Sequence, residues 1–145
     1  MKAVVQRVLN AELKVDGNLI SKIGNGLVVF YGVGVNDTLD KADYLASKIA
    51  KLRIFKDENG KMNKSVLDVA GEILCVSQFT LYADVSHGNR PSFTNAESPE
   101  IASKTYDYFC QKLIENGVMV KRGIFGADMK ILQENDGPVT IIYEL

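Results

Sequence analysis

The stretch LVVFYGVGV, residues 27–35, constrains the fold most strongly because it is apolar throughout apart from two glycines. A strand with one face in water alternates apolar and polar residues, and this stretch has no polar face. We therefore expect a central strand that is covered on both faces. A sheet that contains such a strand needs a further layer of structure on each side.

A β-hairpin is predicted near the start of the chain. Val4–Val8 and Leu13–Val15 have the alternation of strands, and Asp16–Asn18 then turns the chain into Leu19–Ile23. Four later strands are also expected, at Ile73–Val76, Val118–Lys121, Met129–Gln133 and Val139–Tyr143. Asn135–Pro138 is interpreted as a turn between the last two, and Asp57–Ser65 as a turn-rich loop before the strand at Ile73.

Two amphipathic helices are predicted between these strands. The first starts at Asp37 or Thr38, either of which can cap it, and the second starts at Ser98–Pro99 and stops at Asn116–Gly117. Their apolar positions recur with helical spacing, at Ala42, Leu45, Ala46, Ile49 and Leu52 in the first and at Ala102, Tyr106, Phe109 and Leu113 in the second. Residues 1–145 thus predict one mixed α/β domain, with helices over a sheet and a second sheet beneath it.

The charges nearly cancel, with 17 basic residues against 18 acidic ones, which argues against a general nucleic-acid coat protein. A local excess remains, because Asp57 and Glu58 are the only acids among the basic residues Lys48, Lys51, Arg53, Lys56, Lys61 and Lys64. This cluster fits either a solvated helix face or a phosphate-binding site.

Cysteine use and hydropathy indicate a cytoplasmic protein with no signal peptide and no membrane span. Cys75 and Cys110 stand alone in apolar surroundings, as reduced core cysteines do. We expect no metal, because the chain has a single histidine and no metal-ligand spacing. No nucleotide-binding glycine motif is present, and we expect no cofactor.

The strand at Ile73–Val76 ends in polar residues where a plain turn would be usual. Ser77, Gln78 and Thr80 fit either hydrogen bonding to nearby backbone or a functional site at the strand end. A hydroxyl nucleophile needs an adjacent base, and His87 lies seven residues away in a loop. A Ser-His-Asp mechanism is therefore not expected, and His87 is interpreted as a solvated loop residue.

The chain resembles the D-aminoacyl-tRNA deacylase family from end to end. The resemblance rests on QRV and VDG near the start, RIF and KDENGKMN at 53–63, SQFTL at 77–81, GNRPSF at 88–93, SPE at 98–100, FGADM at 125–129 and NDGPVT at 135–140. SQFTL and NDGPVT together, at this separation in a chain of this length, are a specific signal.

The resemblance implies a proofreading hydrolase that removes D-amino acids, and mischarged glycine, from the 3′-terminal adenosine of tRNA. It implies a homodimer of two β-layers with helices on one face. Catalytic residues Ser77, Gln78, Phe79 and Thr80 would line a pocket at the subunit interface. Gly137 and Pro138, joined by a cis bond, would reach in from the partner subunit to select chirality.

Two mechanisms stay open on this resemblance. Thr80 could be the nucleophile, or a water could attack with help from the 2′-hydroxyl of the adenosine, which we prefer because no base is evident near Thr80. Backbone N–H groups around Phe79 and Thr80 would hold the oxyanion. Basic candidates for tRNA contacts are Arg90, Lys51, Arg53 and Lys64. The alternatives are a relative with relaxed chirality that acts on L-alanyl-tRNA, and a non-catalytic module that binds RNA 3′ ends.

Overall fold

The computed structural model describes all 145 residues. It contains two long helices, one short 3-10 helix and eight strands. In chain order the elements are β1 (Lys2–Val15), β2 (Asn18–Ile23), β3 (Gly26–Gly32), α1 (Leu39–Ala50), β4 (Phe55–Lys56), β5 (Met62–Lys64), β6 (Glu72–Ser77), η1 (Phe79–Tyr82), α2 (Pro99–Glu115), β7 (Met119–Arg122) and β8 (Met129–Glu144).

The main sheet has six strands in the order β2-β1-β3-β6-β7, and β8 pairs with β1. Along one edge, β1 pairs antiparallel with β3 and then with β2, while β8 follows its other edge from end to end. The β3–β6 and β6–β7 pairs are parallel. Parallel neighbours need crossover connections, and α1 and α2 provide them.

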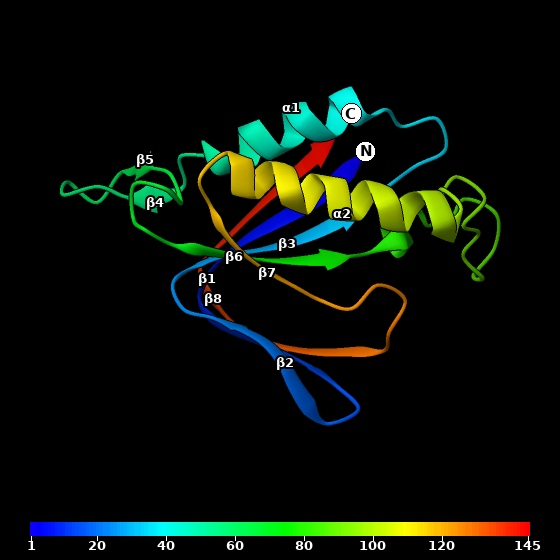
Figure 1. The fold of residues 1–145 in the computed structure, drawn as a ribbon, viewed down its shortest axis with the longest axis horizontal. Helices are drawn as coiled ribbons and strands as arrows, with labels where there is room; N and C mark the ends of the chain where they lie inside the picture. Colours follow the sequence, from blue (N-terminus) through cyan, green and yellow to red (C-terminus); the bar gives the residue numbers. More distant parts are fainter.

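Both helices lie on one face of the sheet, as Figure 1 shows. The crossovers have the same hand, which brings their helices to the same face. The main apolar core fills this layer, with Leu45 and Ile49 of α1 and Phe109 and Leu113 of α2 fully buried against the sheet. Tyr31 of β3 stacks on Phe109 at a ring-centroid distance of 4.0 Å.

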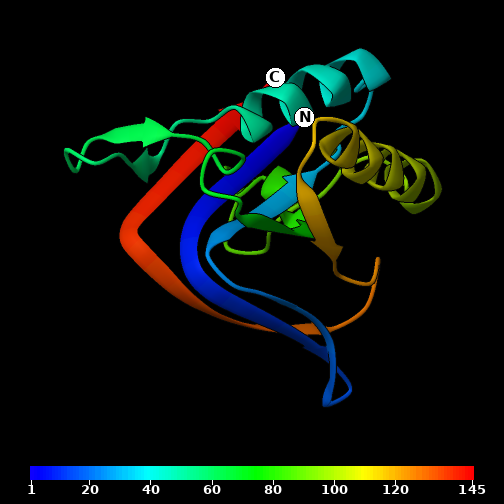
Figure 2. The same ribbon diagram turned by 60° about the vertical axis from the view of Figure 1, so that its left-hand side comes forward.

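The long strands β1 and β8 curve together away from the helices, so that their far halves and β2 form a second β-layer (Figure 2). A separate apolar cluster fills the space between the two layers. In this cluster Ala11 and Leu13 of β1 and Ile23 of β2 pack with two residues of the other layer. These are Val28 of β3 and Leu74 of β6. The expected barrel-like arrangement of two β-layers with helices on one face is confirmed.

The predicted central strand is confirmed as β3, whose residues are buried apart from the partly exposed Phe30. The hairpin and both helices also match their predicted positions, although Thr38 is the N-cap of α1 and makes no side-chain capping bond. The predicted loop Asp57–Ser65 is only partly correct, because Met62–Lys64 forms β5 and pairs with β4 as a second, two-stranded sheet.

The predicted turn at Asn135–Pro138 is wrong, because β8 runs through it as one strand. Its pairing with β1 shifts at this point: Val8 lies opposite Asn135, but Gln6 lies opposite Thr140. The extra residues of β8 form a bulge opposite Arg7, which lets the strand continue while its backbone projects. The Gly137–Pro138 peptide bond in the bulge is cis.

Neither long helix has the length and apolarity needed to cross a membrane. Cys75 and Cys110 are free thiols, and both are buried in the main core, as predicted.

Candidate active site

A cavity of about 630 Å³ lies where β6 ends. Its walls come from five parts of the chain: the residue after β3, the end of β6 with η1, the loop before α2, the first turn of α2, and the loop between β7 and β8 with the first residue of β8. The lining residues are Val33, Ser77, Gln78, Phe79, Phe93, Ala96, Glu97, Ser98, Pro99, Ala102, Phe125, Gly126, Ala127 and Met129. The polar residues that follow the core strand therefore face a cavity.

Main-chain bonds hold the Ser77–Gln78 segment in place. Ser77 still pairs with Tyr31 of β3, and the Gln78 N–H donates to the Tyr31 carbonyl oxygen at 2.8 Å. The side chains are therefore not needed to satisfy this part of the backbone. The Gln78 amide donates to the Thr80 hydroxyl instead.

Thr80 is exposed and does not line the cavity. Its hydroxyl accepts the bond from Gln78, and no carboxylate, histidine or lysine makes a hydrogen bond to it. His87 is exposed in the loop after η1 and lies outside the cavity lining. The structure thus brings Ser77, Gln78 and Phe79 together at the cavity but leaves Thr80 at its margin.

Aromatic rings flank the cavity. Phe79 remains 55% exposed and meets Phe93 edge-on, with ring centroids 4.9 Å apart. Such edge contacts leave one ring face of Phe79 open to a ligand. Phe125 closes another part of the lining and lies near Tyr106, at a centroid distance of 6.4 Å.

The loop between β7 and β8 is fixed to the end of β6 through Cys75. The Gly123 N–H and the Tyr106 hydroxyl both donate to the Cys75 carbonyl oxygen, at 3.0 Å and 2.8 Å. Burial raises the pKa of Tyr106 well above its usual range, so the phenol stays protonated and can donate. These bonds place the start of the Phe125–Met129 segment beside the strand that carries Ser77.

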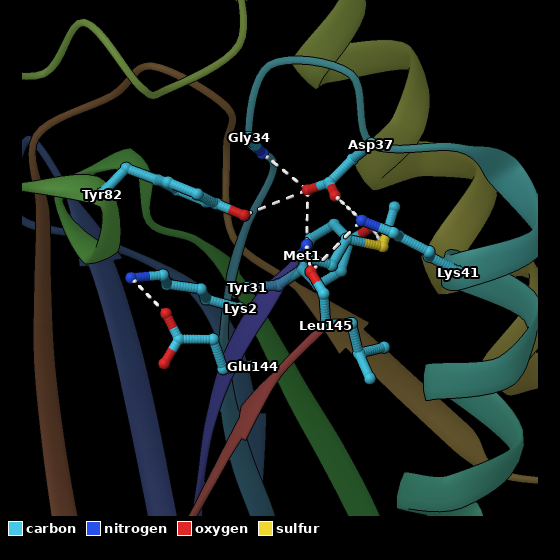
Figure 3. A network of polar contacts seen from close by, with 9 residues as sticks. All are labelled: Met1, Lys2, Tyr31, Gly34, Asp37, Lys41, Tyr82, Glu144 and Leu145. Carbon is cyan, nitrogen blue, oxygen red and sulfur yellow. Dashed lines mark hydrogen bonds and ion pairs between the residues drawn. The ribbon is translucent and has the colours of Figure 1, made fainter.

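A buried ionic network holds the other end of η1 (Figure 3). Oδ2 of Asp37 accepts hydrogen bonds from the Tyr82 hydroxyl at 3.0 Å and from the Gly34 N–H at 2.8 Å. The Met1 ammonium lies 2.6 Å from the same oxygen, and Lys41 Nζ lies 2.8 Å from Oδ1. Asp37, which the sequence suggested as a helix cap, instead ties the N-terminus and α1 to η1.

The electrostatics of Asp37 follow from these contacts. Burial favours the neutral acid, but hydrogen bonds from Lys41, the Met1 ammonium and Gly34 outweigh it and lower the pKa of this carboxyl. Asp37 is therefore ionised at neutral pH. Gly34 has to be a glycine here, since a Cβ would lie 2.5 Å from the Tyr82 ring.

Gly137 and Pro138 are exposed and do not line the cavity of their own chain. Buried Arg7 supports them from below: its Nε lies 2.9 Å from Asp136 Oδ2 and donates to the Asp136 carbonyl oxygen at 3.3 Å, while Nη1 donates to the Ile54 carbonyl oxygen. Gly137 has φ +124°, which glycine adopts far more readily than other residues.

The basic candidates lie apart from the cavity lining. Lys51 and Arg53 line a second groove of about 580 Å³, and the Arg53 Nε donates to the Asn63 carbonyl oxygen at 2.8 Å. Lys64 forms an ion pair with Glu58, and Arg90 is exposed in the loop before α2. No group of three or more His, Cys, Asp or Glu side chains is arranged to hold a metal ion.

Residue-level reasoning did not identify Arg7, Asp37, Phe93, Phe125 or Met129 as parts of the site or its support. A signal existed for Arg7, since a charged residue between Gln6 and Val8 interrupts an otherwise strand-like apolar stretch. Phe93, Phe125 and Met129 fall inside the quoted motifs GNRPSF and FGADM, but nothing local shows that they meet at one cavity.

Comparison with known proteins gives a consistent result. The family model described as D-Tyr-tRNA(Tyr) deacylase matches residues 4–144. A D-aminoacyl-tRNA deacylase of Limosilactobacillus reuteri is 56% identical over 144 residues, covering 99% of both chains. One of Thermosipho melanesiensis is 54% identical over 145 residues, covering 99% of this chain and 97% of the relative.

Two solved structures share the fold. The structure described as c-Myc DNA Unwinding Element Binding Protein has a TM-score of 0.94 and 46% identity, and the match covers 100% of this chain and 99% of that one. A probable eukaryotic D-amino acid tRNA deacylase has a TM-score of 0.86 over 99% of this chain and 98% of its own, and at 17% identity it is similar in fold alone.

Proposed function

The chain belongs to the D-Tyr-tRNA(Tyr) deacylase family, and on that premise we propose that it hydrolyses the ester between a D-amino acid and the 3′-terminal adenosine of tRNA. The observation that carries the proposal is the cavity at the end of β6, where Ser77, Gln78 and Phe79 meet aromatic and small residues from three other segments. Its volume, about 630 Å³, suits a small-molecule-sized group such as an aminoacyl-adenosine.

The residues at the end of β6 and the start of η1 have proposed roles. Phe79 offers an exposed ring face on which the terminal adenine can stack, a common way of holding single-stranded RNA ends. Ser77 and Gln78 supply polar groups that orient the ribose and the ester. Backbone N–H groups of Phe79 and Thr80 are the donors proposed for the oxyanion, where fixed donors contribute most to acyl transfer.

We propose that water attacks the ester with help from the 2′-hydroxyl of the adenosine. Thr80 is a poor candidate for the nucleophile because its hydroxyl is outside the cavity lining and has no basic partner. Aminoacyl esters are activated, so the enzyme has to lower the barrier less than a peptidase does.

The proposed active form is a homodimer. The outer edge of β8 has no strand partner, and Leu132 and Ile142 on this strand are 71% and 70% exposed. An unpaired edge with large exposed apolar residues favours association with a second chain. Gly137 and Pro138 are exposed on the same strand, which supports a role in the partner's cavity.

In that position Gly137 and Pro138 select chirality. The enzyme has to accept many D side chains, so it must recognise the α-carbon. Main-chain carbonyls fixed in position can accept from the substrate α-ammonium and leave no space for an L side chain. Gly137 has no Cβ, which allows close approach of its backbone. On this account glycine esters are also cleaved, because glycine has no side chain to exclude.

Arg90, Lys51, Arg53 and Lys64 remain the candidate contacts to tRNA, and the substrate places the enzyme in the cytoplasm. The alternatives are a relative that acts on L-alanyl-tRNA and a binding module without catalysis. Release of free amino acid from D-tyrosyl-tRNA, measured against buffer alone, separates an enzyme from a binder. Binding of the RNA without release would overturn the proposal.

Mixing variants tests the shared site. One variant carries Gln78→Ala with Phe79→Ala, which damages the cavity, and the other carries Gly137→Val, which blocks the projecting backbone. Each alone is expected to lose most of its activity. Mixed dimers contain one intact cavity facing one intact Gly137, so exchange of subunits should restore activity. Failure to restore it, with subunit exchange demonstrated, would contradict the cross-subunit arrangement.

A further inference from the structure

Some basic side chains of this protein have no acidic partner, and they are concentrated in one region. Most lysines and arginines elsewhere make ion pairs, as Lys2, Lys22 and Lys41 do. Five basic residues between positions 48 and 61 make no ion pair: Lys48, Lys51, Arg53, Lys56 and Lys61. Their charge is therefore available to an external anion.

Three of these cations line the groove of about 580 Å³ between α1 and the end of β8. The lining includes Lys48, Lys51 and Arg53 but no Asp or Glu side chain. A solvated helix face would be expected to mix both signs of charge. This groove instead carries three cations against one anion, the α-carboxylate of Leu145.

Aromatic rings accompany these cations. Tyr44 and Tyr143 both line the groove, and Tyr44 is 52% exposed. Lys48 Nζ lies 5.3 Å from the centre of the Tyr44 ring. Cations interleaved with exposed aromatic rings suit a polymer that combines phosphates with flat bases.

The arrangement of Arg53 also fits a phosphate ligand. Its Nε is engaged by the Asn63 carbonyl oxygen, which fixes the guanidinium. No hydrogen bond within the chain uses its terminal nitrogens, so both can face a phosphate oxygen. Lys56 and Lys61 extend the positive charge onto the β4–β5 hairpin, which Figure 1 shows beyond the C-terminal end of α1. The hairpin also carries Asp57 and Glu58, so the excess of positive charge is greater in the groove.

We infer that this basic groove, defined by Tyr44, Lys48, Lys51, Arg53 and Tyr143, binds the sugar–phosphate backbone of the tRNA acceptor arm. The inference rests on the proposed function for its choice of RNA. The groove shares no lining residue with the catalytic cavity, and Figure 1 shows the β4–β5 hairpin and η1 at opposite ends of the helix layer. The backbone contacts are therefore distinct from those that hold the terminal adenosine.

Binding of uncharged tRNA tests the groove without requiring catalysis. The variant Lys48→Ala/Lys51→Ala removes two charges that make no ion pair or side-chain hydrogen bond within the chain, although Lys48 also lies over the Tyr44 ring. The control Lys14→Ala/Lys121→Ala removes two charges that also make no ion pair, on β1 and β7. We expect the groove variant to bind tRNA about tenfold more weakly at low salt. The slope of the logarithm of the binding constant against the logarithm of salt concentration should become shallower by about 1.5. The control should bind as wild type does.

Hydrolysis rates then show whether the loss of affinity comes from contacts to the tRNA backbone. For the groove variant, kcat/KM on D-tyrosyl-tRNA should fall about tenfold relative to kcat/KM on D-tyrosyl-adenosine, which has no backbone to contact. Equal binding by groove and control variants would overturn the inference. So would displacement of tRNA by millimolar inorganic phosphate or ATP, which would indicate a small-anion site. If the wild type cleaves neither substrate, the proposed function fails, while tRNA binding still decides the groove.

Discussion

Nε of Arg7 lies 2.9 Å from Oδ2 of Asp136, the residue that precedes Gly137 and Pro138. Arg7 is 2% exposed, whereas the two residues that it supports are exposed. The projecting bulge of β8 thus rests on a buried cation in β1. A recognition element built from main chain needs such support, because its precision depends on where the backbone is held.

Replacing Arg7 with Ala should destabilise the protein by about 3 kcal/mol. This is the low end of the cost of breaking a buried ion pair, because the Asp136 side chain is 34% exposed and can be hydrated. The same variant should lose discrimination between D- and L-tyrosyl-tRNA. Arg122→Ala is the control, since Arg122 pairs with exposed Asp107 and should cost less than about 1 kcal/mol. Urea unfolding and both hydrolysis rates would be measured, and an Arg7→Ala protein with wild-type discrimination would contradict the supporting role.

Replacing Asp37 with Asn should cost about 1.5–3 kcal/mol of stability, because the Met1 ammonium and Lys41 lose the carboxylate that accepts from them. The cost stays in this range because burial already lowers the pKa of the Met1 amine, which can release its proton. Tyr82 also loses a charged acceptor, so η1 should become less well held and hydrolysis should fall together with stability. Asp40→Asn, in the first turn of the same helix, is the control and should cost less than about 1 kcal/mol. Equal stability of the two variants would show that the network in Figure 3 contributes little.

The Asp37 network also predicts a direction for the pH dependence of stability. The folded protein lowers the pKa of Asp37, so the unfolded chain binds a proton at this group more readily than the folded one does. Its contribution is complete above the ordinary Asp pKa of about 3.9 and is lost as the pH falls through the lower, folded value. Urea unfolding of wild type and Asp37→Asn from pH 5 to pH 3, below the titration of the Met1 amine, should show their difference shrinking toward acid. A stability difference between the two proteins that grows as the pH falls would contradict the stabilising role of ionised Asp37.

Hydrolysis should not depend on His87 or on a nucleophilic Thr80. His87→Ala should stay within about tenfold of wild type, because a general base usually contributes a factor of 10²–10⁴. Thr80→Ala should retain measurable activity, since its hydroxyl only accepts a bond from Gln78. Single-turnover rates and a search for a covalent intermediate would check both. A thousandfold loss in His87→Ala with an intact fold, or an acyl-enzyme trapped on Thr80, would require a different mechanism.

The fold was largely predictable because the apolar periodicities are strong and local. The apolar stretch from Leu27 predicted the buried strand β3, and both helices begin at their predicted places, although Leu52, expected on the first helix, lies beyond its end at Ala50. The error at Asn135–Pro138 has a physical cause: these residues have turn chemistry, but pairing along the full length of β1 keeps them in β8. Such long-range pairing overrides a local preference and leaves no mark in a short window of sequence.

The site was predictable only in part. Ser77, Gln78 and Thr80 stood out because polar residues at the end of a core strand are unusual, and the structure places the first two at the cavity. Phe79 was expected only from the family resemblance, and it also lines the cavity. Phe93 and Phe125 reach the same cavity from distant segments, so their contribution depends on tertiary packing. Asp37 and Thr38 were both candidate helix caps, and Thr38 is the N-cap, because the carboxylate of Asp37 is engaged by the ammonium of Met1.

We propose that this chain releases D-amino acids from tRNA and spares L-amino acids. The direct test is to incubate the purified protein with D-tyrosyl-tRNA, L-tyrosyl-tRNA and glycyl-tRNA in parallel and to measure the release of free amino acid. We expect release from the D-tyrosyl and glycyl substrates and none above the buffer rate from the L-tyrosyl substrate. Equal release of D- and L-tyrosine, or no release from D-tyrosyl-tRNA, would contradict it.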